Sequence, residues 1–400
     1  NDNPHQESYL RMLGVAGSIE LELKLFQPLL ETHQFQKLKP FISLLNAYFA
    51  FETLSDNLAV GLARCKTPTP FQQMQKQIIL AFNQKMLKKI LSNTNSAGEL
   101  LTKERNKIAH ISLNHQSLAP RQMQIFIDDY EKNYAVKHSD EFEYSFFNIL
   151  ILNISTCLML LDSLKTSPLY LSLKHSLMRR YISVSKIIDH SQQATRVELA
   201  AWGRDSILVV PTYMHCIGAL DLVEPNPNFS QSINNGLLNA AMQDGALCTR
   251  LLNDIGTHLL KADASQRQEL FTCWRNIIPK NTQDVFTKIQ HLAEHPDYHE
   301  CLSRIRKDLN HGEFNVCLDN LASQSTSENN LEIFFKNIDY YADLYQAIRH
   351  KLHNNLTYLN DLLDNDQIST IIGNFVKFHE YKYSFDYESM QGEYAITNNQ

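Results

Sequence analysis

Glycine and proline are scarce in this sequence, with 12 of each among 400 residues. That is about half of their usual combined share of roughly 12%. Collagen-like, low-complexity and turn-rich all-β chains need many more of these residues, and the scarcity excludes those classes. Hydrophobic residues make up 44% of the chain, which is enough for a buried core.

Paired cysteines and an excess of positive charge are also missing. No CxxC motif occurs, and the seven cysteines are scattered at positions 65, 157, 216, 248, 273, 301 and 317. A chain of this size does not need disulfides, so we expect reduced thiols and a cytoplasmic location. Lys and Arg number 37 against 43 Asp and Glu. Without long basic runs, this balance predicts no nucleic-acid partner.

A long apolar run is the third absence. The most apolar stretch, residues 146–161, contains Asn148, Asn153, Ser155 and Thr156. It is therefore shorter than the roughly 18 clean apolar residues of a membrane span, and it predicts a buried core helix. The first ten residues have neither the basic nor the apolar region of a secretory signal. We expect neither a membrane span nor secretion.

What the sequence does contain is helical spacing of apolar residues, as in the segments 21–30 and 41–51. Most prolines fall between such segments, where helices are expected to end. Pro211 is the exception, since it lies within the apolar stretch 207–222 and predicts a kink there. The sequence predicts one all-α domain over residues 1–370, a single large helical bundle, followed by a polar and aromatic C-terminal tail over residues 371–400.

The most informative segment is 246–263, ALCTRLLNDIGTHLLKAD. If it is one helix, Asn253 and Thr257 are four residues apart and share a face, with Arg250 one turn earlier on the same side. Their oxygens could bind a hydrated divalent cation, and the guanidinium could bind a phosphate. The same spacing also fits a solvated helix face.

The run RLLNDIGTH within this segment resembles the second metal-binding motif of class I terpene synthases, in the form found in plant enzymes. The resemblance implies the isoprenoid synthase type of bundle, Mg²⁺ or Mn²⁺ as cofactor, Asn253 and Thr257 as metal ligands, and Arg250 as a diphosphate ligand. The family has a glutamate where this chain has Lys261. Asp263 or a water could substitute, the ammonium could replace cationic charge at the metal site, or the site could be degenerate.

The surroundings of the motif extend the resemblance over residues 170–263. The stretch with Pro211 is similar to the family's kinked helix, and the connecting loop and the next helix follow in the same order. The resemblance implies Arg204 as a second diphosphate ligand, although Arg196 competes for that role.

The Asp-rich motif of the family has no clear counterpart in this chain. Asp128 and Asp129 are the literal candidates for the other metal ligands. Glu52 with Asp56 is a rival pair, four residues apart after an aromatic run. In a third alignment, the motif would fall at residues 109–113, which contain no acidic residue. The three alternatives remain open.

The resemblance implies an enzyme that ionises a C15 or C20 isoprenyl diphosphate with Mg²⁺ and releases a terpene hydrocarbon or alcohol. We expect such a protein to be a monomer or a homodimer. The alternative hypothesis is a non-catalytic helical binding or regulatory module that kept the synthase fold. The sequence contains no GxGxxG, GxxxxGK[ST] or GxSxG, so nucleotide-binding and serine-hydrolase folds have no support.

Overall fold

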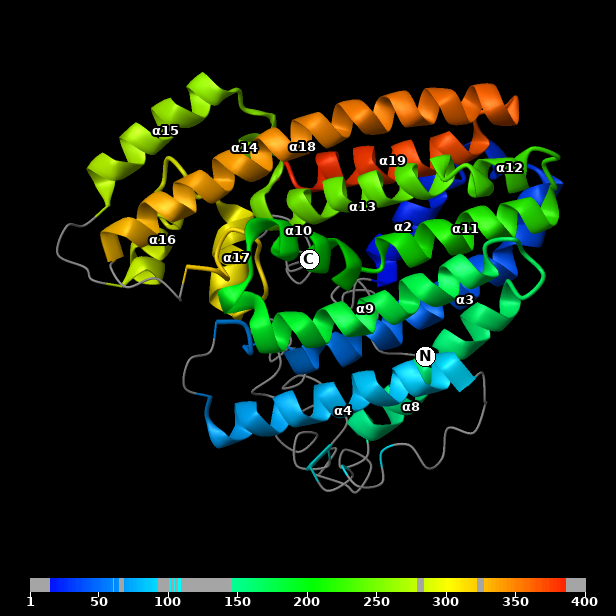
Figure 1. Ribbon diagram of the computed structural model, residues 1–400, viewed down its shortest axis with the longest axis horizontal. Helices are drawn as coiled ribbons and strands as arrows, with labels where there is room; N and C mark the ends of the chain where they lie inside the picture. The colour runs from blue at the N-terminus through cyan, green and yellow to red at the C-terminus, as the bar shows by residue number, and fades with distance from the viewer. Residues whose placement is uncertain are drawn as a thin grey trace, which may run out of the picture. The chain divides into compact units, whose positions relative to one another are not determined.

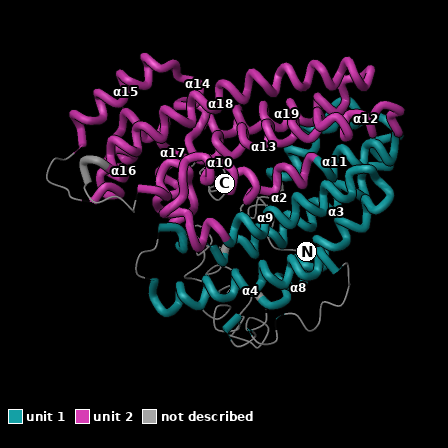
Figure 2. Tube along the Cα trace, in the orientation of Figure 1, with its two compact units in different colours: residues 1–185, 214–224 teal, residues 186–213, 225–400 magenta. Residues whose placement is uncertain are grey.

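The computed structural model describes residues 15–59, 61–64, 68–92, 101, 104, 107–108, 145–278, 284–321 and 327–385. Within these ranges every regular element is an α-helix or a short 3-10 helix, and no strand occurs (Figure 1). The predicted all-α class is therefore confirmed. The chain divides into two compact units, where the sequence predicts one bundle (Figure 2). Unit 1 comprises residues 1–185 and 214–224, and unit 2 comprises residues 186–213 and 225–400.

Unit 1 is built mainly from long helices that bury apolar side chains. The predicted core helix is α8, in which Leu150 and Ile154 are fully buried while Met159 is exposed. The sequence predicts that prolines such as Pro40 mark helix ends. In the structure Pro40 lies inside α3, so this prediction is wrong for Pro40. The helices of unit 1 are α2 (Val15–Leu25), α3 (His33–Asp56), α4 (Pro70–Ser92), α8 (Ser145–Ser163), α9 (Tyr170–His190) through residue 185, and α11 (Val209–Val223) from residue 214.

Unit 2 is centred on α13 (Leu237–Ile255), which is buried along most of its length. It packs against α18 (Ser327–Leu363), α19 (Gln367–Lys382) and α10 (Arg196–Ser206) (Figure 1). The other helices are α12 (Phe229–Asn234), α14 (Thr257–Lys261), α15 (Ala264–Ile277), α16 (Val285–Ala293) and α17 (Ser303–His311).

Gly203 permits the close approach of α10 to α13. A Cβ at this position would lie 3.1 Å from Cε1 of Phe314 and 3.3 Å from Cγ of Arg250. These distances are tighter than ordinary van der Waals contact, so only glycine fits without displacing a neighbour. The side chain of Arg250 is thus packed directly against the backbone of α10.

Two sequence expectations about helix boundaries are corrected by the structure. Pro211 lies in the first turn of α11, where proline is tolerated, and not at a kink within a helix. The chain breaks before it, between Ser206 and Val209. Residues 371–382, expected in the C-terminal tail, belong to α19, because Ile371, Ile372 and Phe375 give this helix a buried apolar face.

Among the described residues, no single helix is both long and apolar enough to cross a bilayer. Helices α10 and α11 reach the necessary length and apolar composition only together, as a pair bent by 44°.

Candidate functional site

The RLLNDIGTH segment does not form the single helix that the sequence predicts. Helix α13 ends at Ile255, and Gly256 has φ +91° and ψ 158° before α14 begins at Thr257. This backbone conformation is accessible essentially to glycine alone. Asn253 and Thr257 therefore lie on different helices, and the expectation that they share one helix face is wrong.

Arg250, the expected diphosphate ligand, is buried in an ion pair with Asp254. Its Nη2 and Nε atoms lie 2.5 and 3.0 Å from the two carboxylate oxygens. Its Nη2 group also donates to the carbonyl of Phe314, and the guanidinium lies 4.8 Å from the centre of that ring. The interactions of Arg250 are thus made within unit 2.

Asp254 is the fully buried centre of this cluster. Besides the guanidinium, its carboxylate accepts from the backbone N–H of Val316 at 3.0 Å. Burial raises the pKa of Asp254 to about 6, while the positive charge of Arg250 opposes the rise. The carboxylate is directed at protein donors and not at solvent.

Asn253 contacts a fourth arginine, Arg304, which sequence reasoning did not single out. The Nη2 group of Arg304 donates to Oδ1 of Asn253 at 2.6 Å, and its Nε donates to the backbone carbonyl of Asn253 at 2.8 Å. The amide of Asn253 donates to Asp254 at 3.1 Å. The oxygen expected to bind a metal therefore faces a guanidinium.

Thr257 and Lys261 both contact Glu380 of α19. The hydroxyl of Thr257 donates to the carbonyl of Glu380 at 2.7 Å, and the ammonium of Lys261 lies 3.3 Å from Oε2 of the same residue. Lys261 is 54% exposed and is paired with this carboxylate. The charge of Lys261 is thus offset by Glu380. One alternative from the sequence was that this ammonium replaces cationic charge at the metal site.

The donor set around the motif does not fit a divalent metal ion. Oδ1 of Asn253 accepts from Arg304, and a second cation, Arg250, is held beside it by Asp254. A hard cation requires several oxygen ligands and is repelled by neighbouring guanidinium groups. Over the ranges that the structure describes, no cluster of three His, Cys, Asp or Glu could hold a metal.

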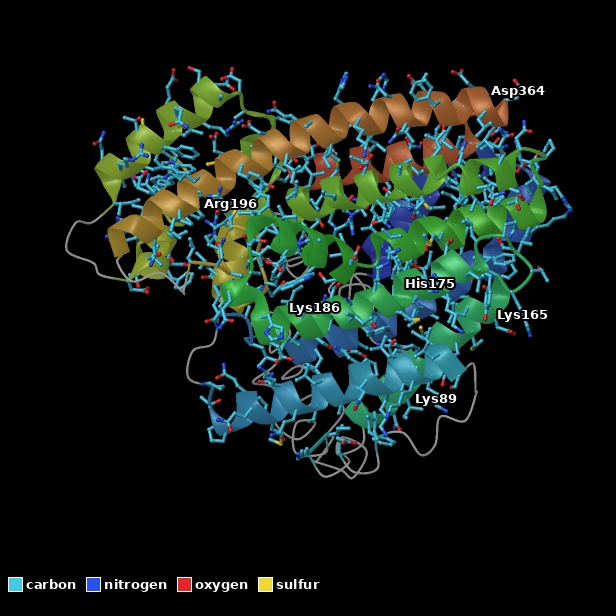
Figure 3. All side chains as sticks on the ribbon, viewed as in Figure 1. Lys89, Lys165, His175, Lys186, Arg196 and Asp364 are labelled. Carbon is cyan, nitrogen blue, oxygen red and sulfur yellow. The ribbon has the colours of Figure 1, made fainter. Side chains whose placement is uncertain are left out.

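The two arginines proposed as the second diphosphate ligand have separate partners. Arg204 donates to Asp205, its neighbour in sequence, at 2.8 Å. Arg196, labelled in Figure 3, donates from Nε to Asn337 at 2.7 Å and lies over the ring of Tyr340. Within the part of the chain that the structure describes, neither arginine hydrogen-bonds to or forms an ion pair with Arg250, Asn253 or Thr257.

The three candidates for the Asp-rich motif have different outcomes. Asp128 and Asp129 lie outside the described residues, as do residues 109–113. Glu52 is buried in unit 1, where Arg180 forms an ion pair with it and lies 3.3 Å from Asp56. Glu52 also accepts from Asn153 at 2.6 Å. This pair of acids is bridged by an internal arginine.

The most important partners of the motif were missed because they are distant in sequence. Arg304 is 51 residues from Asn253, and Glu380 is 119 residues from Lys261. Their own sequence neighbourhoods show only a short basic piece and an aromatic segment. No local spacing connects such positions, so only the packed structure reveals them.

Comparison with known proteins yields no relative for this chain. No protein family, no curated protein and no solved structure matches it. Function is therefore inferred from the geometry of the described residues and from the motif itself.

Proposed function

We propose that this chain is a helical binding or regulatory module, in which the RLLNDIGTH segment joins helices and does not support ionisation of a diphosphate. One observation carries the proposal: Oδ1 of Asn253 and the hydroxyl of Thr257 both hydrogen-bond to groups of unit 2. These contacts connect the end of α13 to α17 and the start of α14 to α19.

Energetics support a structural role for the motif. Breaking a buried ion pair by removing one partner costs about 3–5 kcal/mol, because the remaining charge stays buried and unpaired. A diphosphate that recruited Arg250 would leave Asp254 in that state. A metal at Asn253 would likewise have to displace the guanidinium of Arg304. Both exchanges oppose catalytic use of the motif.

The test is an activity assay on the full chain. The protein is incubated with Mg²⁺ and geranyl, farnesyl or geranylgeranyl diphosphate, and products are sought by gas chromatography. The proposal predicts no hydrocarbon or alcohol product from any of the three. Asn253→Ala should lower the free energy of unfolding through loss of the Arg304 contact, while exposed Asn234→Ala should not. Magnesium-dependent product formation would overturn the proposal.

The motif favours a second candidate function, a class I terpene synthase acting on a C15 or C20 isoprenyl diphosphate with Mg²⁺ or Mn²⁺. In this candidate, Arg250 and Arg204 bind the diphosphate, and Asn253 and Thr257 bind one metal ion. Asp128 and Asp129 are then the literal candidates for the other metal ligands. Its support is the match of RLLNDIGTH and of the flanking residues 170–263 to that family.

Lys261→Glu separates the two candidates. In a synthase, the substitution restores the family's carboxylate and should lower the Mg²⁺ concentration needed for turnover. In a binding module, it places a second carboxylate beside Glu380 and should only reduce stability by like-charge repulsion. The measurements are product formation across a Mg²⁺ series and the midpoint of thermal unfolding.

A further inference from the structure

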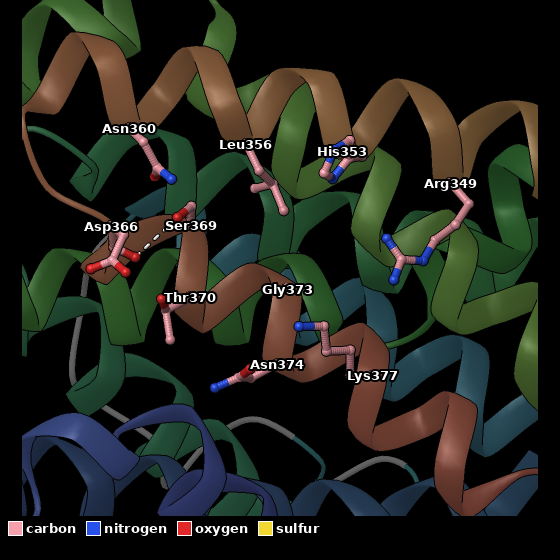
Figure 4. A pocket seen from close by; sticks show the side chains of 10 residues that line it. All are labelled: Arg349, His353, Leu356, Asn360, Asp366, Ser369, Thr370, Gly373, Asn374 and Lys377. Carbon is pink, nitrogen blue, oxygen red and sulfur yellow. Dashed lines mark hydrogen bonds between the residues drawn. The ribbon is translucent and has the colours of Figure 1, made fainter.

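Two adjoining cavities lie along α18 and α19 of unit 2, and they share Arg349 and His353 (Figure 4). The first has a volume of about 250 Å³ and reaches from Arg349 to Asp366. The second has a volume of about 490 Å³ and reaches to Lys261 and Glu380. The larger volume lies within the range of roughly 300–1,000 Å³ that is usual for small-molecule sites. We call the two cavities together the α18–α19 groove.

Arg349 stands where the two cavities meet, and one edge of its guanidinium is fixed. Nε donates to Oε1 of Glu380 at 2.8 Å, and Tyr345 donates to the same oxygen at 2.6 Å. Burial alone would raise the pKa of Glu380, but the hydrogen bonds from Tyr345 and Arg349 lower it below its ordinary value. Glu380 is thus an ionised anchor that holds Arg349 by Nε.

The opposite edge of the same guanidinium is available to a ligand. Among the described residues, the only hydrogen bond of Arg349 is the one from Nε, so neither Nη group has an acceptor there. Figure 4 shows the side chains of Arg349 and His353 projecting from α18 toward α19, which contributes Lys377. A planar guanidinium with two free Nη groups matches the paired oxygens of a phosphate or a carboxylate.

The other end of the first cavity has the opposite polarity. Asn360, Ser369 and Asp366 line it, far from Arg349 in Figure 4. Oδ1 of Asn360 is buried and has no hydrogen-bond partner among the residues that the structure describes, which leaves an acceptor that needs a donor. Asp366 adds a carboxylate at the start of α19. This end is suited to hydroxyl groups that donate.

We propose that the α18–α19 groove binds a small hydroxylated ligand that carries an oxyanion, either a phosphate ester or a carboxylate. The oxyanion is received by the Nη groups of Arg349 together with Lys377, and the hydroxyl groups donate to Asn360 and Asp366. The carboxylate of Glu380 is engaged by Arg349, Tyr345 and Lys261, and Asp263 caps α15, so neither opposes the anion as a free charge would. Ligand binding in the α18–α19 groove does not depend on whether the chain ionises a diphosphate.

The experiment is isothermal titration of the full chain with glycerol phosphate, glycerate and inorganic phosphate. We expect glycerol phosphate or glycerate to bind, and the preferred one identifies the oxyanion. Arg349→Gln should weaken binding at least tenfold, since it removes the charge and the paired Nη donors. Lys336→Gln removes an exposed charge elsewhere on α18 and should leave the affinity unchanged.

Two further variants keep the test decisive if Arg349→Gln is unstable. Lys377 is exposed on α19 and lines the first cavity. Lys377→Gln should therefore weaken binding about threefold without changing the unfolding midpoint. Asn360→Leu should weaken binding of glycerol phosphate while leaving the affinity for inorganic phosphate unchanged, because only the former carries hydroxyl groups. The proposal is overturned if the wild type binds none of the three probes, or if the Arg349 and Lys377 variants bind as tightly as the wild type.

Discussion

Glu22 shows how far burial changes the chemistry of a single residue in unit 1. The residue is 2% exposed, and within the described ranges only Oε2 of its carboxyl group has a hydrogen-bond partner, the amide of Asn46 at 2.5 Å. Burial raises the pKa of this carboxyl group from 4.5 to about 8. At neutral pH the group is therefore mostly protonated in the folded chain.

This shift makes stability depend on pH in a defined window. The folded chain holds a proton on Glu22 that the unfolded chain loses above pH 4.5. The contribution of Glu22 to the free energy of unfolding is therefore complete below pH 4.5 and is lost as the pH rises through about 8. Glu22→Gln cannot ionise, so it should be more stable than the wild type at pH 9, by roughly 2–4 kcal/mol. Urea unfolding across the pH range measures the difference. Exposed Glu31→Gln is the control, and an unchanged pH dependence in Glu22→Gln would contradict the assignment.

Asn253 in unit 2 shows that the role of a residue depends on its neighbours in space. Its spacing from Thr257 fits either a cation site or a solvated helix face, and the family resemblance implies the metal role, while its oxygen in the structure faces Arg304. The residue type was compatible with both roles, because an amide oxygen accepts from a guanidinium as readily as it ligates a cation. Its neighbours in space determine which role it can take.

At the scale of an element, the break between α13 and α14 depends on Gly256. A Cβ there would meet only ordinary contacts, the nearest being Cγ of Arg304 at 3.5 Å. The cost of a side chain would therefore come from the backbone conformation itself, at φ +91°.

We predict that Gly256→Ala destabilises the chain by about 1–3 kcal/mol. Gly373→Ala is the matched control, because Gly373 lies within α19 and a Cβ there would be 3.6 Å from Leu356. Alanine favours a helix interior by up to about 1 kcal/mol over glycine, so the control should be neutral or stabilising. Thermal unfolding of both variants gives the comparison, and equal effects would contradict the role of Gly256.

At the scale of the whole molecule, the structure predicts stability that does not depend on a divalent metal. A metal that binds only the folded state would add about 2.7 kcal/mol at 100 times its Kd. Because Oδ1 of Asn253 accepts from Arg304 and Lys261 is paired with Glu380, we expect the same unfolding midpoint in EDTA and in excess Mg²⁺. A clear rise of the midpoint with Mg²⁺ would support the synthase candidate instead.

The division of the chain into two units is also a property of the whole molecule. The sequence shows no composition shift or linker at residues 185 or 213, and the polar stretch that follows residue 224, PNPNFSQSINN, is too short for an obvious linker between units. The boundary at 213 falls within α11, and the boundary at 185 falls within α9. Apolar spacing predicts which face of each helix is buried, but it contains no information about which helices share a core.

The helical class of this protein and the burial of segments such as α8 could be predicted from the amino-acid sequence alone. Helices depend on contacts three and four residues apart, so apolar spacing and a shortage of breakers are enough to predict them. The partners of the polar side chains, in contrast, are known only from the packed structure. Asn253 meets Arg304 and Lys261 meets Glu380 across 51 and 119 residues, and no local pattern specifies contacts that form only when separate helices pack together.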